Sequence, residues 1–116
     1  MPETQEVTKS DRDLTAFQQN LLSVLAEEAR YGLAIKRELE DYYGEEVNHG
    51  RLYPNLDELI EQGLIEKSEL DKRTNEYAIT EYGLTVLLDH FDWQFSKFQT
   101  NQERTEDLQA LLDDHR

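Results

Sequence analysis

The chain has 116 residues, the length of a single domain. It carries 12 Lys and Arg against 26 Asp and Glu, a formal net charge of −14 that is spread over both halves. The absence of cysteine excludes disulfides, thiolate catalysis and thiol-based sensing. Because no apolar run is long enough for a membrane helix and the N-terminus lacks a signal-peptide pattern, we expect a soluble, cytoplasmic protein.

The acidic charge is the most unusual feature of the composition. At low ionic strength such a coat repels itself and would also repel a phosphate backbone. In molar salt the Debye length falls to about 3 Å, and both repulsions are screened. The composition therefore suggests a salt-loaded cytoplasm, as in halophilic archaea. An ordinary acidic protein whose partners are not nucleic acids is the alternative.

The N-terminal third is predicted to be an arm followed by a helix. Residues 1–12 are polar and aperiodic, which indicates a flexible arm. Apolar residues then recur at helical spacing through about Glu28, and Asp13 or its neighbour Asp11 is a candidate N-cap for this helix.

Two further helices are predicted in the middle part of the chain. The second spans about 33–43, and Gly44 is expected to end it as a C-terminal cap. The third carries an apolar face. It also contains Pro54, and proline is tolerated without strain only in the first turn of a helix. We therefore expect its regular part to begin near Leu52 or Tyr53, after a tight lead-in.

The periodicity changes after the third helix. Residues 64–70 and 76–79 can run extended on either side of the polar turn 71–75, which predicts a β-hairpin. Thr80 is then expected to cap a long final helix. Residues 99–116 either continue that helix or form a separate short one. The expected fold is mainly α with a small β-hairpin, in the order of a winged helix-turn-helix.

The final helix carries an apolar stripe close to a heptad seam. It exceeds what a small domain covers, so we expect a second copy to bury it. The predicted homodimer interface consists of Leu84, Leu88, Phe91, Phe95 and Phe98. A ligand pocket lined by Trp93 and neighbouring phenylalanines is the alternative, and a small-molecule effector stays open. The expected organisation is thus an arm over 1–12, a DNA-binding domain over 13–80 and a dimerisation helix or helices over 81–116.

Two segments are suited to duplex DNA, since a helix fits the major groove and a hairpin reaches the adjacent backbone. The stretch from Asn48 to Asn55 contains no acidic residue, in a chain where more than one residue in five is acidic. Its candidate contacts are Asn48, His49, Arg51, Tyr53 and Asn55. The predicted hairpin is the wing of this fold, and its candidate contacts are Lys67, Lys72, Arg73 and Thr74.

Two other function classes fit less of the sequence. A winged helix with acidic faces can serve as a protein-interaction module for basic partners. A metal-dependent enzyme or metal sensor could use Asp89, His90 and Asp92, although their spacing is generic. Nothing organises a catalytic triad or a phosphate loop, so we expect a protein that is not an enzyme and has no cofactor or metal.

Four motifs in this sequence resemble the PadR-like family of winged-helix transcription regulators. They are YGLAI at 31–35, GRLYPNL at 50–56, LIEQGLI at 59–65 and YAITEYG at 77–83. The resemblance covers about residues 15–95, and the acidic coat is similar to that of haloarchaeal members, among them a regulator of oxidative-stress genes. It implies a homodimer joined through C-terminal helices, with the 48–55 segment in the major groove of a pseudo-palindromic operator. The C-terminal region is shorter here than in larger relatives.

Overall fold

The computed structural model describes residues 6–71, 74–99 and 102–116. The elements in chain order are α1 (Lys9–Arg12), α2 (Ala16–Glu27), β1 (Arg30–Tyr31), α3 (Gly32–Tyr43), α4 (His49–Glu61), β2 (Ile65–Glu69), β3 (Asn75–Ile79), α5 (Glu81–Phe98) and α6 (Gln102–His115). This order confirms a mainly helical winged helix-turn-helix with a long C-terminal helix, α5, after the hairpin.

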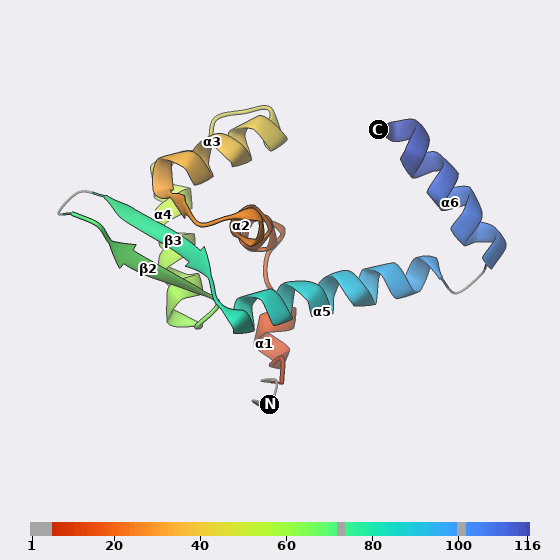
Figure 1. Ribbon diagram of the computed structural model, residues 1–116, viewed down its shortest axis with the longest axis horizontal. Coiled ribbons are helices and arrows are strands. Elements are labelled where there is room, and N and C mark those ends of the chain that lie inside the picture. Colours follow the sequence, from red (N-terminus) through yellow and green to blue (C-terminus); the bar gives the residue numbers. More distant parts are fainter. Residues whose placement is uncertain (1–5, 72–73, 100–101) are drawn as a thin grey trace.

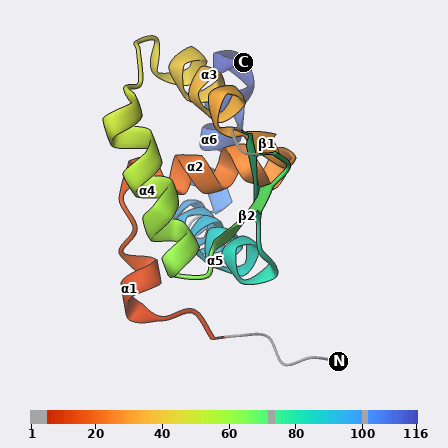
Figure 2. The same cartoon turned by 90° about the vertical axis from the view of Figure 1, so that its left-hand side faces the viewer.

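Helices α2, α3 and α4 enclose one apolar core, and an antiparallel sheet of order β1-β3-β2 closes its remaining side. Figure 2 shows α4 along one side of α2, with the sheet on the other. The fully buried side chains include Leu21, Leu22, Ile35, Leu52 and Leu56. Within α4, for example, Leu52, Leu56 and Leu59 follow one another at four- and three-residue spacing, because the helix presents one face to the core.

Helix α2 begins later than the predicted caps, Asp11 and Asp13, would place it. Its N-cap is Thr15, whose hydroxyl accepts a hydrogen bond from the N–H of Gln18 at 3.1 Å. The side chain of Gln18 in turn accepts from the N–H of Thr15 at 3.2 Å. Since this capping box satisfies two backbone donors at once, it outcompetes either aspartate, and the predicted cap was wrong.

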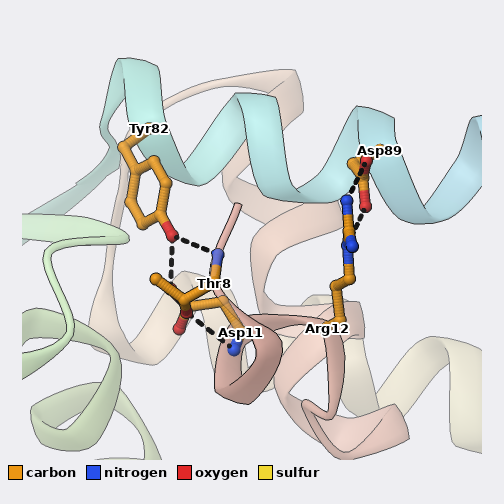
Figure 3. Close-up of polar contacts among 5 residues, drawn as sticks. All are labelled: Thr8, Asp11, Arg12, Tyr82 and Asp89. Atoms are coloured by element: carbon orange, nitrogen blue, oxygen red, sulfur yellow. Dashed lines mark hydrogen bonds and ion pairs between the residues drawn. The ribbon is translucent and has the colours of Figure 1, made fainter. Parts of the chain in front are cut away.

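The segment before α2 differs from the predicted flexible arm, because Lys9–Arg12 form the short helix α1 against α5 (Figure 3). The hydroxyl of Tyr82 donates to the carboxylate of Asp11, which is only 6% exposed, and accepts from the N–H of Thr8. The guanidinium of Arg12 pairs with Asp89 at 3.1 Å. Two of these partners lie more than 70 residues away in the chain, so local periodicity carries no sign of them.

Helix α3 matches its predicted bounds to within one residue, and a short connection joins its end to α4. Gly44 follows it with φ +73°, a left-handed conformation that glycine adopts without steric cost. In the connection to α4, the carboxylate of Glu40 accepts from Lys36 at 2.7 Å and from the N–H of Val47 at 2.9 Å. The hydrogen bond from Lys36, followed by that from Val47, lowers the pKa of Glu40.

Helix α4 begins at His49, earlier than the predicted regular start near Leu52 or Tyr53, and it includes Pro54. Proline has no N–H, so the carbonyl of Gly50 lacks its usual partner four residues on. Because Gly50 lies on an exposed face, solvent can satisfy that carbonyl. The helix therefore begins more than one turn before the proline, instead of holding the proline in its first turn as predicted.

The predicted hairpin is present, with Ile65 opposite Ile79 and Glu69 opposite Asn75. Beyond that prediction, β1 adds a third strand by pairing Arg30 with Tyr77. The sequence shows only a break in helical spacing here, since a two-residue strand has no periodicity of its own.

The chain leaves the sheet through Thr80, which caps α5 as predicted by accepting from the N–H of Gly83 at 2.9 Å. Figure 1 shows α5 running away from the domain and α6 turning back from its far end, so the C-terminal segment is a separate helix. In the part of the chain that the structure describes, no helix is long and apolar enough to span a membrane.

Candidate nucleic-acid interface

The first turn of α4 is exposed and is organised by Asn48. The side-chain oxygen of Asn48 accepts from the N–H of Arg51 at 2.8 Å, which caps the helix. His49, Gly50 and Arg51 consequently form a regular exposed turn at the start of the segment 48–55, which is predicted to enter the major groove. Asn48 is therefore the cap of this helix as well as a candidate contact.

Arg51 has a defined direction despite its exposure. Its guanidinium carbon lies 4.0 Å from the ring centroid of Phe17, which is 4% exposed and belongs to α2. A guanidinium over an aromatic face is attracted by the ring quadrupole, and its N–H groups remain able to donate at the edge. Phe17 thus restricts where Arg51 presents its donors.

His49 and Tyr53 form a second ordered pair on α4. Their rings stack with centroids 5.6 Å apart and planes 10° from parallel. Tyr53 also lies over the start of α3, where a Cβ added at Gly32 would come within 2.7 Å of the tyrosine hydroxyl oxygen. Gly32 therefore leaves the space that Tyr53 occupies.

Asn55 is more engaged inside the domain than the other candidate contacts. Its amide nitrogen donates to the carbonyl of Arg51 at 2.7 Å, and its oxygen accepts from Gln18 at 3.2 Å. Gln18 is 5% exposed and also donates to Glu58 at 3.0 Å. This geometry suits Asn55 to fixing α4 against α2, a role that helical spacing alone does not indicate.

Of the predicted wing contacts, the structure describes two and leaves two outside its described residues. Lys67 lies exposed on β2, opposite Tyr77 on β3. Thr74 is half-buried, and its hydroxyl donates to Asp71 at 3.3 Å. The predicted contacts Lys72 and Arg73 lie outside the described residues.

A hollow of about 400 Å³ is lined by Tyr53 of α4, by the start of α3 and by residues 74, 75 and 77 of the wing. Sequence reasoning missed this place and the exposed residues Tyr31 and Arg37 that line it. No side chain caps the first N–H groups of α3, and this end of the helix carries a partial positive charge. A signal was present, because residues 30–37 contain no acidic side chain.

Tyr77 forms part of the same hollow and is 3% exposed. Burial, and then the negative charges that Tyr53 and Asp57 can carry, raises the pKa of Tyr77 above its ordinary value. Tyr77 therefore keeps its proton and adds no negative charge to this face.

The predicted dimer residues share the outer face of α5. They are 39–63% exposed, with spacings of four, three, four and three residues, and are Leu84, Leu88, Phe91, Phe95 and Phe98. The opposite face packs on the domain through Gly83 and Val86. Phe91 and Phe95 stack with centroids 6.2 Å apart. We refer to the five exposed residues as the α5 seam.

The candidate metal ligands on α5 do not form a site. Asp89 pairs with Arg12, and the described residues contain no group of three side chains able to hold a metal ion. His90, Asp92 and Trp93 instead line an open hollow beside α1.

Comparisons with known proteins identify the family. The model of the transcriptional regulator PadR-like family matches residues 21–89. RosR of H. salinarum, from crystals grown from NaBr, is 64% identical over 90% of this chain and 94% of its own, with a TM-score of 0.79. A complex structure of hsRosR-S1 gives 63% identity over 92% and 96%, with a TM-score of 0.82.

A more distant likeness agrees with this assignment. A transcriptional regulator from Clostridium thermocellum is 26% identical over 69% of this chain and 84% of its own, with a TM-score of 0.58. A search of curated protein sequences found no match. The matched family and the RosR structures are transcription regulators, not enzymes. The chain therefore belongs to the PadR-like family of transcriptional regulators.

Proposed function

We propose that this regulator binds duplex operator DNA in a sequence-specific manner as a homodimer. The observation that carries the proposal is the surface at the starts of α4 and α3. Arg51 and Arg37 are exposed there, and acidic residues are absent from both 30–37 and 48–55. In a chain of net charge −14, a face of this kind is suited to an anionic partner.

On this proposal each group has a distinct part. Arg51 and the His49–Tyr53 pair reach base edges from α4, which enters the major groove. Arg37 and the uncapped N–H groups of α3 contact phosphate. Lys67 and Thr74, together with Lys72 and Arg73, contact the adjacent backbone from the wing.

The homodimer is proposed on the α5 seam. Five large apolar side chains at heptad spacing are exposed in a single chain, and a second copy would bury them. A two-fold dimer would present two copies of α4 to half-sites about one helical turn of DNA apart. Replacing Phe91 by glutamate places a charge in that seam, so Phe91→Glu should give monomers in sedimentation, whereas intact dimers would exclude the seam.

The working environment is proposed to be a high-salt cytoplasm, as the acidic composition suggests. A role in the stress response is proposed from the resemblance of the sequence motifs to haloarchaeal regulators of oxidative-stress genes. Since the chain has no cysteine, a thiol cannot serve as its oxidant sensor. The acidic surface outside the α4 face would oppose DNA at low salt, and molar salt would screen that repulsion.

The test is selection of binding sites from random duplexes at molar KCl, followed by footprinting of the enriched sequence. Enrichment of a motif with two related half-sites would support the proposal. Enrichment of no motif by folded protein would instead favour a protein-interaction module with an acidic surface.

A further inference from the structure

The head group of Arg51 is held by a residue that belongs to another helix and lies in the core. The guanidinium carbon is 4.0 Å from the ring centroid of Phe17, and that ring is buried in the domain. An arginine side chain on an open surface samples many rotamers, whereas a bidentate contact with a base edge needs one orientation. A fixed ring beneath the guanidinium therefore reduces the entropy that Arg51 loses when such a contact forms.

The ring of Phe17 is itself fixed between helices. It stacks with the ring of Tyr43 on α3, with centroids 6.2 Å apart and planes 15° from parallel. The hydroxyl of Tyr43 accepts from the amide nitrogen of Asn20 at 2.8 Å, which ties α3 back to α2 one turn beyond Phe17. By contrast, Lys97 lies over Trp93 within a single helix, and Trp93 is 59% exposed. The platform under Arg51 is thus part of the folded core.

The next residue of α2 acts on the other end of Arg51. Gln18 donates to the side-chain oxygen of Asn55, whose amide nitrogen donates to the main-chain carbonyl of Arg51. Two consecutive residues of α2 therefore contact Arg51, Gln18 indirectly at its backbone and Phe17 directly at its guanidinium. Neither is exposed, so neither can reach DNA itself.

We propose that Phe17 is a positioning residue for DNA recognition, which determines the base specificity of the α4 face through Arg51. The inference rests on the proposed function and places a determinant of its specificity outside α4. Phosphate contacts bind any duplex, whereas contacts with base edges select a sequence. Loss of the platform should therefore affect the base pair that Arg51 reads and spare the rest of the site.

The acidic charge of the chain increases the importance of such a contact. With a net charge of −14, the protein gains little long-range attraction to DNA. In molar salt the Debye length is about 3 Å, so exposed charges further apart hardly interact. Recognition under these conditions depends on side chains that are already oriented at short range, as Arg51 is by Phe17.

The test compares variants that remove the ring with one that keeps it. Phe17→Leu and Phe17→Met keep an apolar side chain, and Phe17→Tyr keeps the aromatic face. Anisotropy of the selected operator should give a dissociation constant about three- to tenfold higher for Phe17→Leu and Phe17→Met, and one within about twofold of the unmodified chain for Phe17→Tyr. Leu25→Val is the matched control, because it alters the same buried side of α2 two turns further along and should leave the constant unchanged.

Arg51→Ala separates positioning from packing. In a chain that already carries Arg51→Ala, Phe17→Leu should change operator binding by less than about twofold, since the residue that it positions is gone. Operators with one base pair replaced at a time give a second measurement. Phe17→Leu should lose discrimination at the same base pair as Arg51→Ala and keep it elsewhere. A merely structural role would weaken binding equally in both backgrounds and at every base pair.

Urea unfolding verifies that each variant is folded. Undiminished operator affinity of folded Phe17→Leu and Phe17→Met would overturn the inference. So would an equal loss in the two Arg51 backgrounds, or an Arg51→Ala chain that binds as well as the unmodified one. Selective binding that survives both Phe17 substitutions removes only the positioning role. Absence of selective binding by the unmodified chain removes the proposed function as well.

Discussion

The junction between the wing and α5 allows a prediction whose magnitude follows from the structure. A Cβ added at Gly83 would lie 2.0 Å from the carbonyl oxygen of Leu64 and 2.9 Å from a side-chain carbon of Ile79. That carbonyl also accepts from the N–H of Thr80 at 3.0 Å, and it shares the hydroxyl of Thr80, at 3.0 Å, with the carbonyl of Gly63, at 2.7 Å. Relief of the clash would therefore move α5 and break both hydrogen bonds.

Gly83→Ala should lower the free energy of unfolding by about 3 kcal/mol. Overpacking costs roughly 2 kcal/mol and the two lost hydrogen bonds roughly 1 kcal/mol each, while alanine returns roughly 1 kcal/mol of helix propensity. Gly50→Ala is the matched control, because its Cβ would meet only Asn48 at 3.4 Å on an exposed face. The control should gain about 0.5–1 kcal/mol of stability.

Urea unfolding of both variants at molar KCl, followed by circular dichroism, provides the assay. The midpoint for Gly83→Ala should fall well below that of the unmodified chain, and the midpoint for Gly50→Ala should not. Two variants of equal stability would refute the reasoning, because they would show that α5 can shift against β2 at no cost.

Three further predictions concern other contacts. Tyr82→Phe removes one hydrogen-bond donor to the buried carboxylate of Asp11, at a cost of about 1–3 kcal/mol. Helix α1 should therefore detach and lose amide-exchange protection while the core keeps it. Unchanged protection of α1 would show that the Tyr82–Asp11 hydrogen bond does not hold this helix in place. Because the pKa of Tyr77 is raised in the folded chain, the unfolded chain loses the phenol proton first as pH rises above about 10, so the free energy of unfolding is intact below that pH and falls above it. In urea titrations at alkaline pH, Tyr77→Phe should lose less stability than the unmodified chain. Parallel pH dependences of the two proteins would reject a raised pKa for Tyr77. Gly32→Ala should displace Tyr53 and weaken operator binding several-fold in a gel-shift titration with little change in unfolding, and undiminished affinity would remove Tyr53 from the interface.

The parts of the fold predicted from the sequence are those that local chemistry determines. Gly44 ends α3 and Thr80 starts α5 because a left-handed cap and a hydroxyl N-cap act within a few residues. The start of α2 was mispredicted since two kinds of cap compete over a short stretch, and the reciprocal Thr15–Gln18 pair satisfies more backbone donors than a single aspartate.

The parts that sequence reasoning missed depend on distant partners. Helix α1 is held in place by contacts with Tyr82 and Asp89, and β1 forms because it pairs with the edge of β3. The same limit applies within the candidate interface. The composition of 48–55 predicted an anion-facing surface, but the engagement of Asn55 by Gln18 is visible only once α2 and α4 are packed together.

The central claim is that the α4 face of this regulator binds operator DNA. The most direct test is fluorescence anisotropy of the selected duplex, titrated with the unmodified chain, Arg51→Ala and Arg116→Ala across KCl concentrations up to molar. Arg116 carries the same charge at the C-terminus and serves as the control. The account predicts binding that persists at molar KCl, a loss of about 1–3 kcal/mol for Arg51→Ala and no loss for Arg116→Ala. Equal affinity of all three proteins, or no binding at any salt concentration, would contradict it.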